Sequence, residues 1–269
     1  PFKEYIERNI MRPLGMADTG YDITVSPADR RALGYRFENG AHAREPDMVH
    51  GAFGAMGGVQ TTATDYSKWV AFLLSAWPPR DDAEAGPARR SSVRELVQGL
   101  NFPQRVQRPG LSTPACTQAM TYGMGMRVAQ DCDAGLTLAH GGGYPGYGSY
   151  VLLLPEHDLG IFVFANRTYA GPSGAAWDIA MELKKAGWLT GRAIPVSTAL
   201  AQLYATTQAM FTARRLEPGK SLLAQNFLMD RSEANWQAEF ERLASQSGTC
   251  RTNAPIVPSG ALSGAFSWT

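Results

Sequence analysis

The stretch "TLAHGGGYPGYGSYVLLLPEHDLGIFVFANRTY", residues 137–169, carries the signal that decides the fold. Runs of aromatic, leucine and β-branched residues are interrupted by glycine and by a Pro-Gly pair, a pattern typical of strands joined by turns. We therefore expect adjacent antiparallel strands at about residues 136–142, 148–154 and 160–166.

Three consecutive glycines follow His140 in this stretch. Residues Gly141, Gly142 and Gly143 place no Cβ beside the histidine, so another backbone or an extended ligand can approach the strand edge and bond to it. The N–H of Gly143 is a candidate donor to an oxyanion, and His140 can gain or lose a proton near neutral pH. The alternative is a glycine-rich turn with a structural histidine, and the local pattern alone favours that alternative.

Length and composition indicate a globular chain. Its 269 residues, 44% hydrophobic and 18% charged, allow one or two domains. The 25 basic and 24 acidic residues nearly cancel, so the charge predicts no nucleic-acid partner. No apolar run reaches the roughly 20 residues of a membrane-spanning helix, and the first residues show no signal segment.

Local signals predict several elements before the opening stretch. The chain starts in a helical pattern, "PFKEYIERNI", and Asn39-Gly40 predicts a tight hairpin. Thr62, followed three residues later by Asp65, fits a capping box in which the hydroxyl accepts a backbone N–H and the carboxylate reaches back. The helix that follows has an apolar stripe that we interpret as core: Tyr66, Trp69, Val70 and Leu73.

Further elements surround the predicted strands. Residues 76–118, rich in proline and polar residues, are expected to form a covering subdomain with one helix near 92–100. The segment "TYGMGMRV", residues 121–128, restores β character. After the strands, Ser173 is expected to cap a helix over about 174–187 that packs on one face of the sheet.

A change of pattern near "TGRAIPV" predicts a domain boundary. We expect one domain over 1–188, a linker at 189–195, and two amphipathic helices in a partial accessory domain at 196–269. The chain opens inside a helical pattern and closes on "GALSGAFSWT", which resembles a strand that has barely begun. We therefore expect it to be a piece of a longer polypeptide.

The three cysteines, Cys116, Cys132 and Cys250, lack the spacing of a zinc site. Cys116 and Cys132 flank a single segment and could form a disulfide, which would leave Cys250 to pair outside the chain, or all three could be thiols. The histidines other than His140 have no nearby ligand residues, so no metal site is predicted.

Four segments occur in the order and spacing of the penicillin-recognising serine hydrolases: "PFKEYIERNIMRPLGMADTGY", "AMGGVQTTATDYSKWVAFLL", "YGMGM" and "HGGGYPGYGSYVLLLPEHDLGIFVFANRTY". Over about residues 1–187 the chain resembles this family, most closely the class C β-lactamase branch with its related esterases and D-amino-acid peptidases. The resemblance implies an α+β, β-lactamase/transpeptidase-like fold, an antiparallel sheet flanked by helices, of which this chain holds the C-terminal half.

The resemblance also implies roles for individual residues. His140-Gly141-Gly142 resembles the triplet that lies on the sheet edge in that family, and Gly143 would supply the second oxyanion N–H. Gly141 and Gly142 would bind substrate, together with Thr168 in "NRTYAGPSG", a segment that resembles the family's carboxylate-binding segment.

The chain also departs from the family pattern. It contains no Ser-x-x-Lys and lacks the Tyr-x-Asn element, so the nucleophile is expected upstream of this chain. Gly171 and Gly174 stand where an amide and a base are expected, and glycine replaces the family's threonine at 141. The loss of these donors for a carboxylate favours an esterase or peptidase over a dedicated β-lactamase.

The resemblance therefore implies part of a serine hydrolase that forms an acyl-enzyme with a small ester, amide or peptide, without metal or organic cofactor. The chain alone is expected to be inactive. The alternatives are a penicillin-receptor-like sensor with little turnover and a purely structural fragment. A cell-envelope setting, periplasmic or secreted, is implied as well, and with it a Cys116–Cys132 disulfide.

Overall fold

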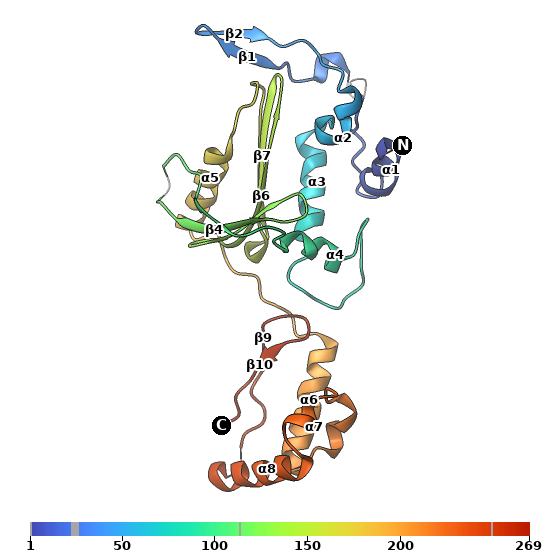
Figure 1. Cartoon of the computed structure of the whole chain (residues 1–269), viewed down its shortest axis with the longest axis vertical. Coiled ribbons are helices and arrows are strands. Elements are labelled where there is room, and N and C mark those ends of the chain that lie inside the picture. The colour runs from blue at the N-terminus through green and yellow to red at the C-terminus, as the bar shows by residue number, and fades with distance from the viewer. Residues whose placement is uncertain (1, 23–26, 113, 249) are drawn as a thin grey trace. The chain divides into compact units, whose positions relative to one another are not determined.

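The computed structural model describes residues 2–22, 27–112, 114–248 and 250–269. It forms two compact units, the first made of Pro1–Trp77 with Ala83–Arg192 and the second of Pro78–Asp82 with Ala193–Thr269. Figure 1 shows the elements of each unit. Within the described ranges, no helix has the length and apolar character needed to cross a membrane.

A six-stranded antiparallel sheet forms the centre of the first unit, and each strand pairs with the next strand along the chain. The expected strands of the opening stretch are confirmed as the last three of this sheet. The strands are β3 (Gln104–Gln107), β4 (Thr117–Tyr122), β5 (Arg127–Asp131), β6 (Gly135–Tyr144), β7 (Tyr147–Leu154) and β8 (Leu159–Ala165).

Tight turns follow the sequence signals closely. Pro145 and Gly146 join β6 to β7, and Gly146 has φ +90°, the conformation that glycine supplies at the third position of a type II turn. Asn39-Gly40 joins β1 (Tyr35–Glu38) to β2 (Ala41–Arg44) with positive φ at both residues, which confirms the predicted hairpin.

Helices cover both faces of the sheet. Helix α3 (Ala63–Leu74) packs on one face, and α5 (Ser173–Lys185) packs on the other, as Figure 1 shows. Residues 152–154 of β7 are all fully buried, because successive side chains point to opposite faces of the sheet and each face is covered by a helix. The α3 core contains Val70, Leu73, Leu138, Val151 and Leu153, and the α5 core contains Leu152, Leu154, Ile161, Trp177 and Ala180.

The start of α5 differs from the prediction at one residue. Pro172 occupies the N-cap position and makes no side-chain capping bond. Ser173 is already the first residue of the helix. The predicted Ser173 cap was therefore wrong, because the chain enters the helix one residue earlier than its sequence signal suggested.

Short helices complete the first unit. The opening helical pattern becomes α1 (Phe2–Ile6) and a π-helical turn at Glu7–Met11. The helix expected near 92–100 is shorter and earlier, because α4 (Arg90–Arg94) continues only as a 3₁₀ turn at Glu95–Val97. The remaining elements are α2 (Gly54–Gly57) and 3₁₀ turns at Ala28–Arg30, Gly51–Phe53 and Pro155–His157.

Asp65 ties the N-terminal segment to α3. Thr62 accepts the Asp65 N–H at 3.1 Å, as predicted. The Asp65 carboxylate instead accepts bonds from the Asp18 N–H at 2.7 Å, Thr19 Oγ1 at 2.9 Å and Lys68 Nζ at 2.7 Å, so its predicted return bond is wrong. Burial alone would raise the pKa of Asp65, but hydrogen bonds from Lys68, Thr19 and Asp18 together hold it below its usual value.

We expect Asp65→Asn to lower the free energy of unfolding of the first unit by about 2 kcal/mol at neutral pH, because a buried charged acceptor is lost. A lowered carboxyl pKa stabilises the fold above the unfolded pKa, and this contribution disappears as pH falls through the folded value. The difference in unfolding free energy between variant and wild type should therefore become smaller below about pH 4. Denaturant titration at several pH values measures this difference.

Asp22→Asn is the matched control, because the Asp22 side chain is 69% exposed and pairs only at the surface with Lys3. It should change the unfolding free energy by less than about 0.5 kcal/mol. Equal effects of the two variants would contradict the assignment of Asp65 as a structural anchor.

A buried ion pair and a disulfide stabilise the β3–β5 end of the sheet. Arg108 makes two bonds to Asp131, at 2.6 and 2.8 Å, and both side chains are fully buried. Burial would raise the pKa of Asp131, but the hydrogen bonds to its carboxylate lower it below the usual value. The Cys116–Cys132 disulfide, with Cα atoms 6.1 Å apart, is present as predicted, and Cys250 is free.

Reducing this disulfide should lower the free energy of unfolding by about 3 kcal/mol, the chain-entropy value for a loop of about 15 residues. Thiol alkylation with mass spectrometry should find one reactive cysteine in the unfolded, unreduced protein and three after reduction. Three labelled cysteines before reduction would contradict the bridge, and Cys250→Ser provides the control that removes the expected free thiol.

The second unit is mainly helical and has a small aromatic core. Tyr204, Phe211, Phe266 and Trp268 contact one another, with ring centroids 4.8–6.1 Å apart. Its elements are α6 (Thr198–Ala213), a 3₁₀ turn at Glu217–Leu222, α7 (Phe227–Asp230), α8 (Glu233–Ser247), β9 (Val257–Pro258) and β10 (Gly264–Ala265).

Candidate functional site

The site begins where β6 extends beyond its neighbour. Strand β5 pairs with β6 only as far as Ala139, opposite Arg127, whereas β7 pairs with β6 up to Tyr144. Among the described residues, positions 140–144 therefore have no strand partner on the β5 side. We call this segment the open edge.

Backbone groups on the open edge point outward at alternate residues. In an antiparallel hairpin closed by a two-residue turn, the pair that flanks the turn is hydrogen-bonded and the pairs alternate from there. The flanking pair here is Tyr144 with Tyr147, so the next pair, Gly143 with Gly148, is not hydrogen-bonded. The N–H and C=O of Gly143, and those of Gly141, consequently face the open edge.

The three glycines differ in what surrounds them. A Cβ on Gly142 would lie 2.3 Å from Ser149 Oγ, and one on Gly143 would lie 2.5 Å from the ring of Tyr169. A Cβ on Gly141 would meet its nearest neighbours at 3.7 Å, an ordinary contact. A side chain at 143 would therefore displace the Tyr169 ring, whereas one at 142 would need only a rotation of the Ser149 hydroxyl, and position 141 has room for a side chain.

His140 is the first residue of β6 that has no partner on β5, because β5 begins at Arg127, opposite Ala139. The side chain of His140 is exposed. Its Nε2 lies 3.0 Å from Tyr122 Oη, within hydrogen-bond distance. By strand alternation its side chain leaves the same face as that of Leu138, the face covered by α3. Tyr122 was not predicted as a site residue, although the segment "TYGMGM" that contains it has a distinctive pattern.

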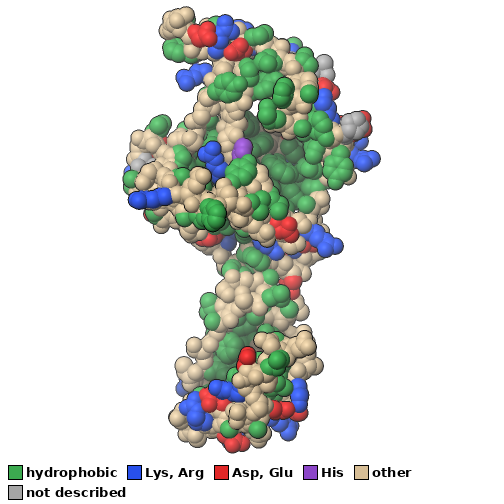
Figure 2. All heavy atoms as spheres, viewed as in Figure 1, with side chains coloured by type: hydrophobic (Ala, Val, Ile, Leu, Met, Phe, Trp, Pro, Cys, Tyr) green, Lys and Arg blue, Asp and Glu red, His purple; other side chains and the backbone are tan. Residues whose placement is uncertain are grey.

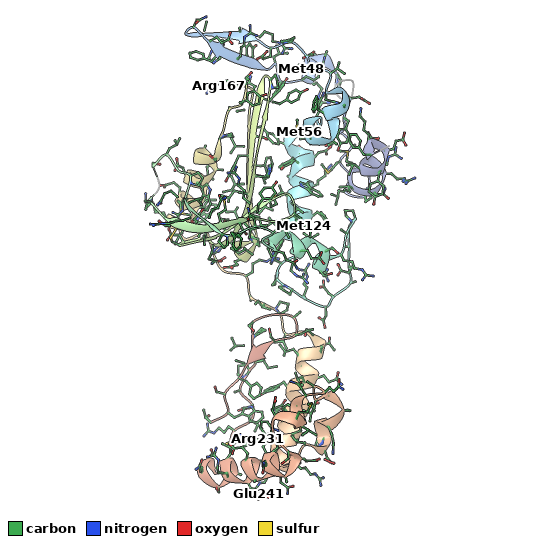
Figure 3. All side chains as sticks on the ribbon, viewed as in Figure 1. Met48, Met56, Met124, Arg167, Arg231 and Glu241 are labelled. Carbon is green, nitrogen blue, oxygen red and sulfur yellow. A yellow bond between two sulfur atoms is a disulfide. The ribbon has the colours of Figure 1, made fainter. Side chains whose placement is uncertain are left out.

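The first unit has exposed apolar side chains. They include Met56 from α2, Met124 from the β4–β5 turn and Phe164 from β8, whose ring contacts that of Tyr66 on α3. Figure 2 shows hydrophobic side chains around a hollow of this unit, and Figure 3 labels Met56 and Met124.

Thr168 is engaged within the protein. Its Oγ1 accepts the Gly146 N–H at 2.7 Å and lies 2.9 Å from Glu45 Oε1 and 3.2 Å from the Tyr35 carbonyl. The single hydroxyl proton is donated to one of these two oxygens, so Thr168 joins the end of β8 to the β1–β2 hairpin. With Arg167, labelled in Figure 3, it lines a hollow of about 280 Å³.

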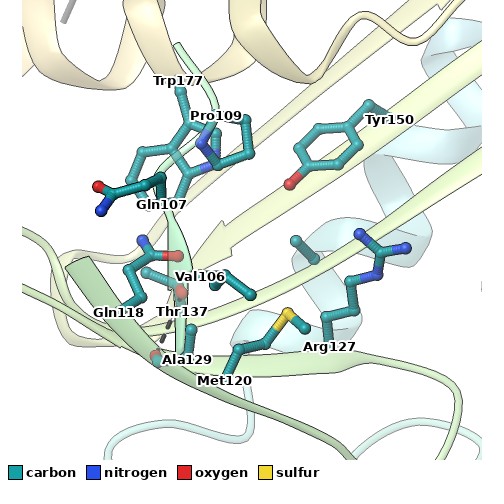
Figure 4. Close-up of a pocket in the computed structure, with 11 residues that line it drawn as sticks. Val106, Gln107, Pro109, Gln118, Met120, Arg127, Ala129, Thr137, Tyr150 and Trp177 are labelled. Carbon is teal, nitrogen blue, oxygen red and sulfur yellow. Dashed lines mark hydrogen bonds between the residues drawn. The ribbon is translucent and has the colours of Figure 1, made fainter. Parts of the chain in front are cut away.

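A separate cavity of about 100 Å³ lies on the α5 face. Figure 4 shows Tyr150, Arg127 and Trp177 among its lining residues. Burial raises the pKa of Tyr150, and the Arg127 charge opposes this rise. By strand alternation Ala139, which lines the cavity, and His140 lie on opposite faces of β6, so this cavity is distinct from the histidine site.

Within the ranges that the structure describes, no three His, Cys, Asp or Glu side chains are grouped closely enough to hold an ion. The functional groups at the open edge are an imidazole, a phenol and backbone N–H groups.

Comparison with known proteins places this fold. The family model described as "Beta-lactamase" matches residues 1–185. The chain belongs to the beta-lactamase family. The expected β-lactamase/transpeptidase-like fold is thereby confirmed.

Relatives of this beta-lactamase-family chain include two Escherichia coli (strain K12) proteins. "D-alanyl-D-alanine-carboxypeptidase/endopeptidase AmpH" is 30% identical over 171 residues, which cover 62% of this chain and 40% of the relative. A protein named "Beta-lactamase" is 24% identical over 199 residues, 66% of this chain and 50% of the relative. The chain thus spans half or less of the length of these relatives.

A solved structure supports the fold of this beta-lactamase-family chain. The octameric penicillin-binding protein homologue from Pyrococcus abyssi superposes with a TM-score of 0.51 at 19% identity, covering 68% of this chain and 38% of the other. At this identity the likeness concerns the fold alone.

Proposed function

We propose that this chain is the C-terminal half of a serine hydrolase domain that forms an acyl-enzyme with a small ester, amide or peptide. The observation that carries the proposal is the open edge, where His140 and the outward N–H of Gly143 occur together beyond the end of β5. The attacking serine would come from a segment upstream of Pro1.

In this proposal the substrate lies along the open edge and bonds to its free backbone groups. The serine oxygen bonds to the substrate carbonyl carbon, and the developing oxyanion accepts the Gly143 N–H. The bond from carbon to the leaving group then breaks, and the proton from the serine passes to the leaving group. His140 would take part in this proton transfer or orient the groups that perform it.

The names of the relatives support an ester, amide or peptide as substrate, since one is a carboxypeptidase/endopeptidase and another a β-lactamase. Thr168 argues against strong carboxylate binding in the present arrangement, because its hydroxyl proton is already donated within the protein. We therefore favour an esterase or peptidase over a dedicated β-lactamase.

The proposal also covers the cellular compartment of the protein and the role of the second unit. The Cys116–Cys132 disulfide supports an oxidising compartment, so we propose a periplasmic or secreted protein. We also propose that residues 196–269, after a linker at 189–195, form part of an accessory domain. The second compact unit, which takes in Ala193–Thr269, supports this division.

In the longer protein that carries the nucleophile, we expect His140→Ala to lower kcat/KM for an activated ester by about 10²-fold or more, because proton transfer loses its positioned group. Steady-state and burst kinetics measure the effect. A loss below threefold would return His140 to a structural role.

The present chain is the control for this assay. Expressed alone it should release no burst of product above a heat-treated sample, because the open edge has no nucleophile to position. A burst from this chain that His140→Ala abolishes would contradict an upstream nucleophile.

The oxyanion role of Gly143 can be separated from its steric role. Because any Cβ at 143 would collide with the ring of Tyr169, the comparison is made in a Tyr169→Ala background of the longer protein. There Gly143→Ala keeps the N–H and Gly143→Pro removes it. We expect the proline variant to have about 10²-fold lower kcat than the alanine variant. Equal activity of the two variants would remove Gly143 from the catalytic machinery.

A further inference from the structure

We propose that Tyr122 is a positioning residue for His140: its phenol O–H donates to Nε2, so that the neutral imidazole carries its own proton on Nδ1. This proposal extends the proposed function. Only the use of Nδ1 by the site rests on that function. The hydrogen bond and the tautomer are properties of the chain itself.

The contact that carries the proposal joins two strands that are not neighbours in the sheet. Tyr122 is the last residue of β4, and its Oη lies 3.0 Å from Nε2 of His140 on β6. The two ring centroids are 6.0 Å apart, with planes inclined at 65°. Strand β5 begins at Arg127, and the contact is formed at the end of the sheet where β5 no longer pairs with β6.

The chemistry of the two groups assigns the donor. A phenol can donate one proton and can also accept, whereas neutral imidazole has one N–H donor and one strongly basic acceptor nitrogen. The imidazole nitrogen is a much better acceptor than a phenol oxygen, so the neutral pair is best satisfied as O–H donating to Nε2. Among the described residues, Tyr122 Oη has no other hydrogen-bond partner to compete for its proton.

The backbone of Tyr122 is fixed on three sides. Its N–H donates to Asn101 Oδ1 at 2.9 Å, and its carbonyl accepts the Leu100 N–H at 2.9 Å. The next residue is Gly123, where a Cβ would lie 2.1 Å from the Leu96 carbonyl oxygen. The Tyr-Gly pair in "TYGMGM" thus has a physical explanation, since the glycine permits the close approach that holds the tyrosine in place.

The consequence for His140 is that only one ring nitrogen remains for the site. Nε2 is occupied by Tyr122, and Nδ1 has no hydrogen-bond partner among the described residues. His140 is exposed on the open edge, so Nδ1 is the ring atom left to contact a substrate or a group from the upstream segment. In its neutral form this atom carries a proton and acts as a donor.

The direct test is long-range ¹H–¹⁵N correlation NMR on the present chain with ¹⁵N-labelled histidine, at about pH 8.5, above the ordinary titration range of histidine. The chain has four histidines, so the spectrum is simple, and His140→Gln assigns the signal of interest. We expect His140 to show the Nδ1–H pattern in the wild type. Tyr122→Phe should shift it to the Nε2–H tautomer that exposed histidines favour in water.

Tyr147→Phe is the matched control. It also removes one phenol, whose Oη donates to the Ala32 carbonyl at 2.7 Å, and it should leave the His140 tautomer unchanged. A wild-type His140 in the Nε2–H form would overturn the proposal, and so would a tautomer that Tyr122→Phe does not change. Neither result depends on hydrolytic activity, so failure of the proposed function would be seen separately.

Kinetics of the longer protein give a second readout. Tyr122→Phe should lower kcat by about tenfold with little change in KM, and it should have no further effect in a His140→Ala background, because the tyrosine acts through the histidine. A tenfold loss that persists without His140 would show that Tyr122 acts on its own and would overturn its assignment as a positioning residue.

Discussion

The site depends on the point at which β5 begins. Strand β5 has five residues and β6 has ten, so β6 continues past its neighbour and exposes backbone groups from His140 onward. The β4–β5 turn sets this point, with the Gly123 N–H bonded to the Met126 carbonyl at 2.8 Å. A longer β5 would pair with residues 140–144 and remove the open edge, whatever side chains those residues carried. The same turn places Tyr122 beside His140, so one local feature determines both the exposed backbone and the partner of the imidazole.

The rest of the first unit keeps β6 in place. Alternate side chains of β7 enter the cores below α3 and α5, and the fully buried residues 152–154 leave the strand little freedom to shift register. At the β3–β5 end, the buried Arg108–Asp131 pair fixes the strand ends. Such a pair adds little net stability over an apolar replacement, but removal of one partner leaves an uncompensated buried charge and is costly. Its contribution is therefore best understood as fixing the arrangement of the strands.

Local patterns predicted much of this fold because the interactions behind them are local. The Asn39-Gly40 hairpin, the Pro145-Gly146 turn and the last three strands depend on residues close in sequence. Resemblance to a known family supplied the fold class and the disulfide. Contacts between distant segments were not predictable in the same way. The Asp65 carboxylate bonds to Asp18 and Thr19, 47 and 46 positions away, where the local pattern indicated a return bond to its own helix start.

The site shows the same division. The glycine run identified His140 and Gly143, but neither the Tyr122 contact nor the internal role of Thr168 has a signature in spacing, because each joins separate elements in space. The shift of the helix start at Ser173 was a smaller difference, of one residue, which is the precision that capping signals usually allow.

A side chain at Gly143 would collide with the Tyr169 ring, and this packing is compatible with a functional role for the open edge. The Tyr169 ring occupies the space beside Gly143 that a side chain would fill, on the α5 face of the strand. A ligand is therefore hindered from reaching Gly143 on that face, whereas the outward N–H on the edge remains accessible. His140 leaves the opposite, α3 face, so a group bound at the edge would have the backbone donor in the plane of the sheet and the imidazole above it. The close packing that demands glycine thus also restricts the direction from which a substrate can approach.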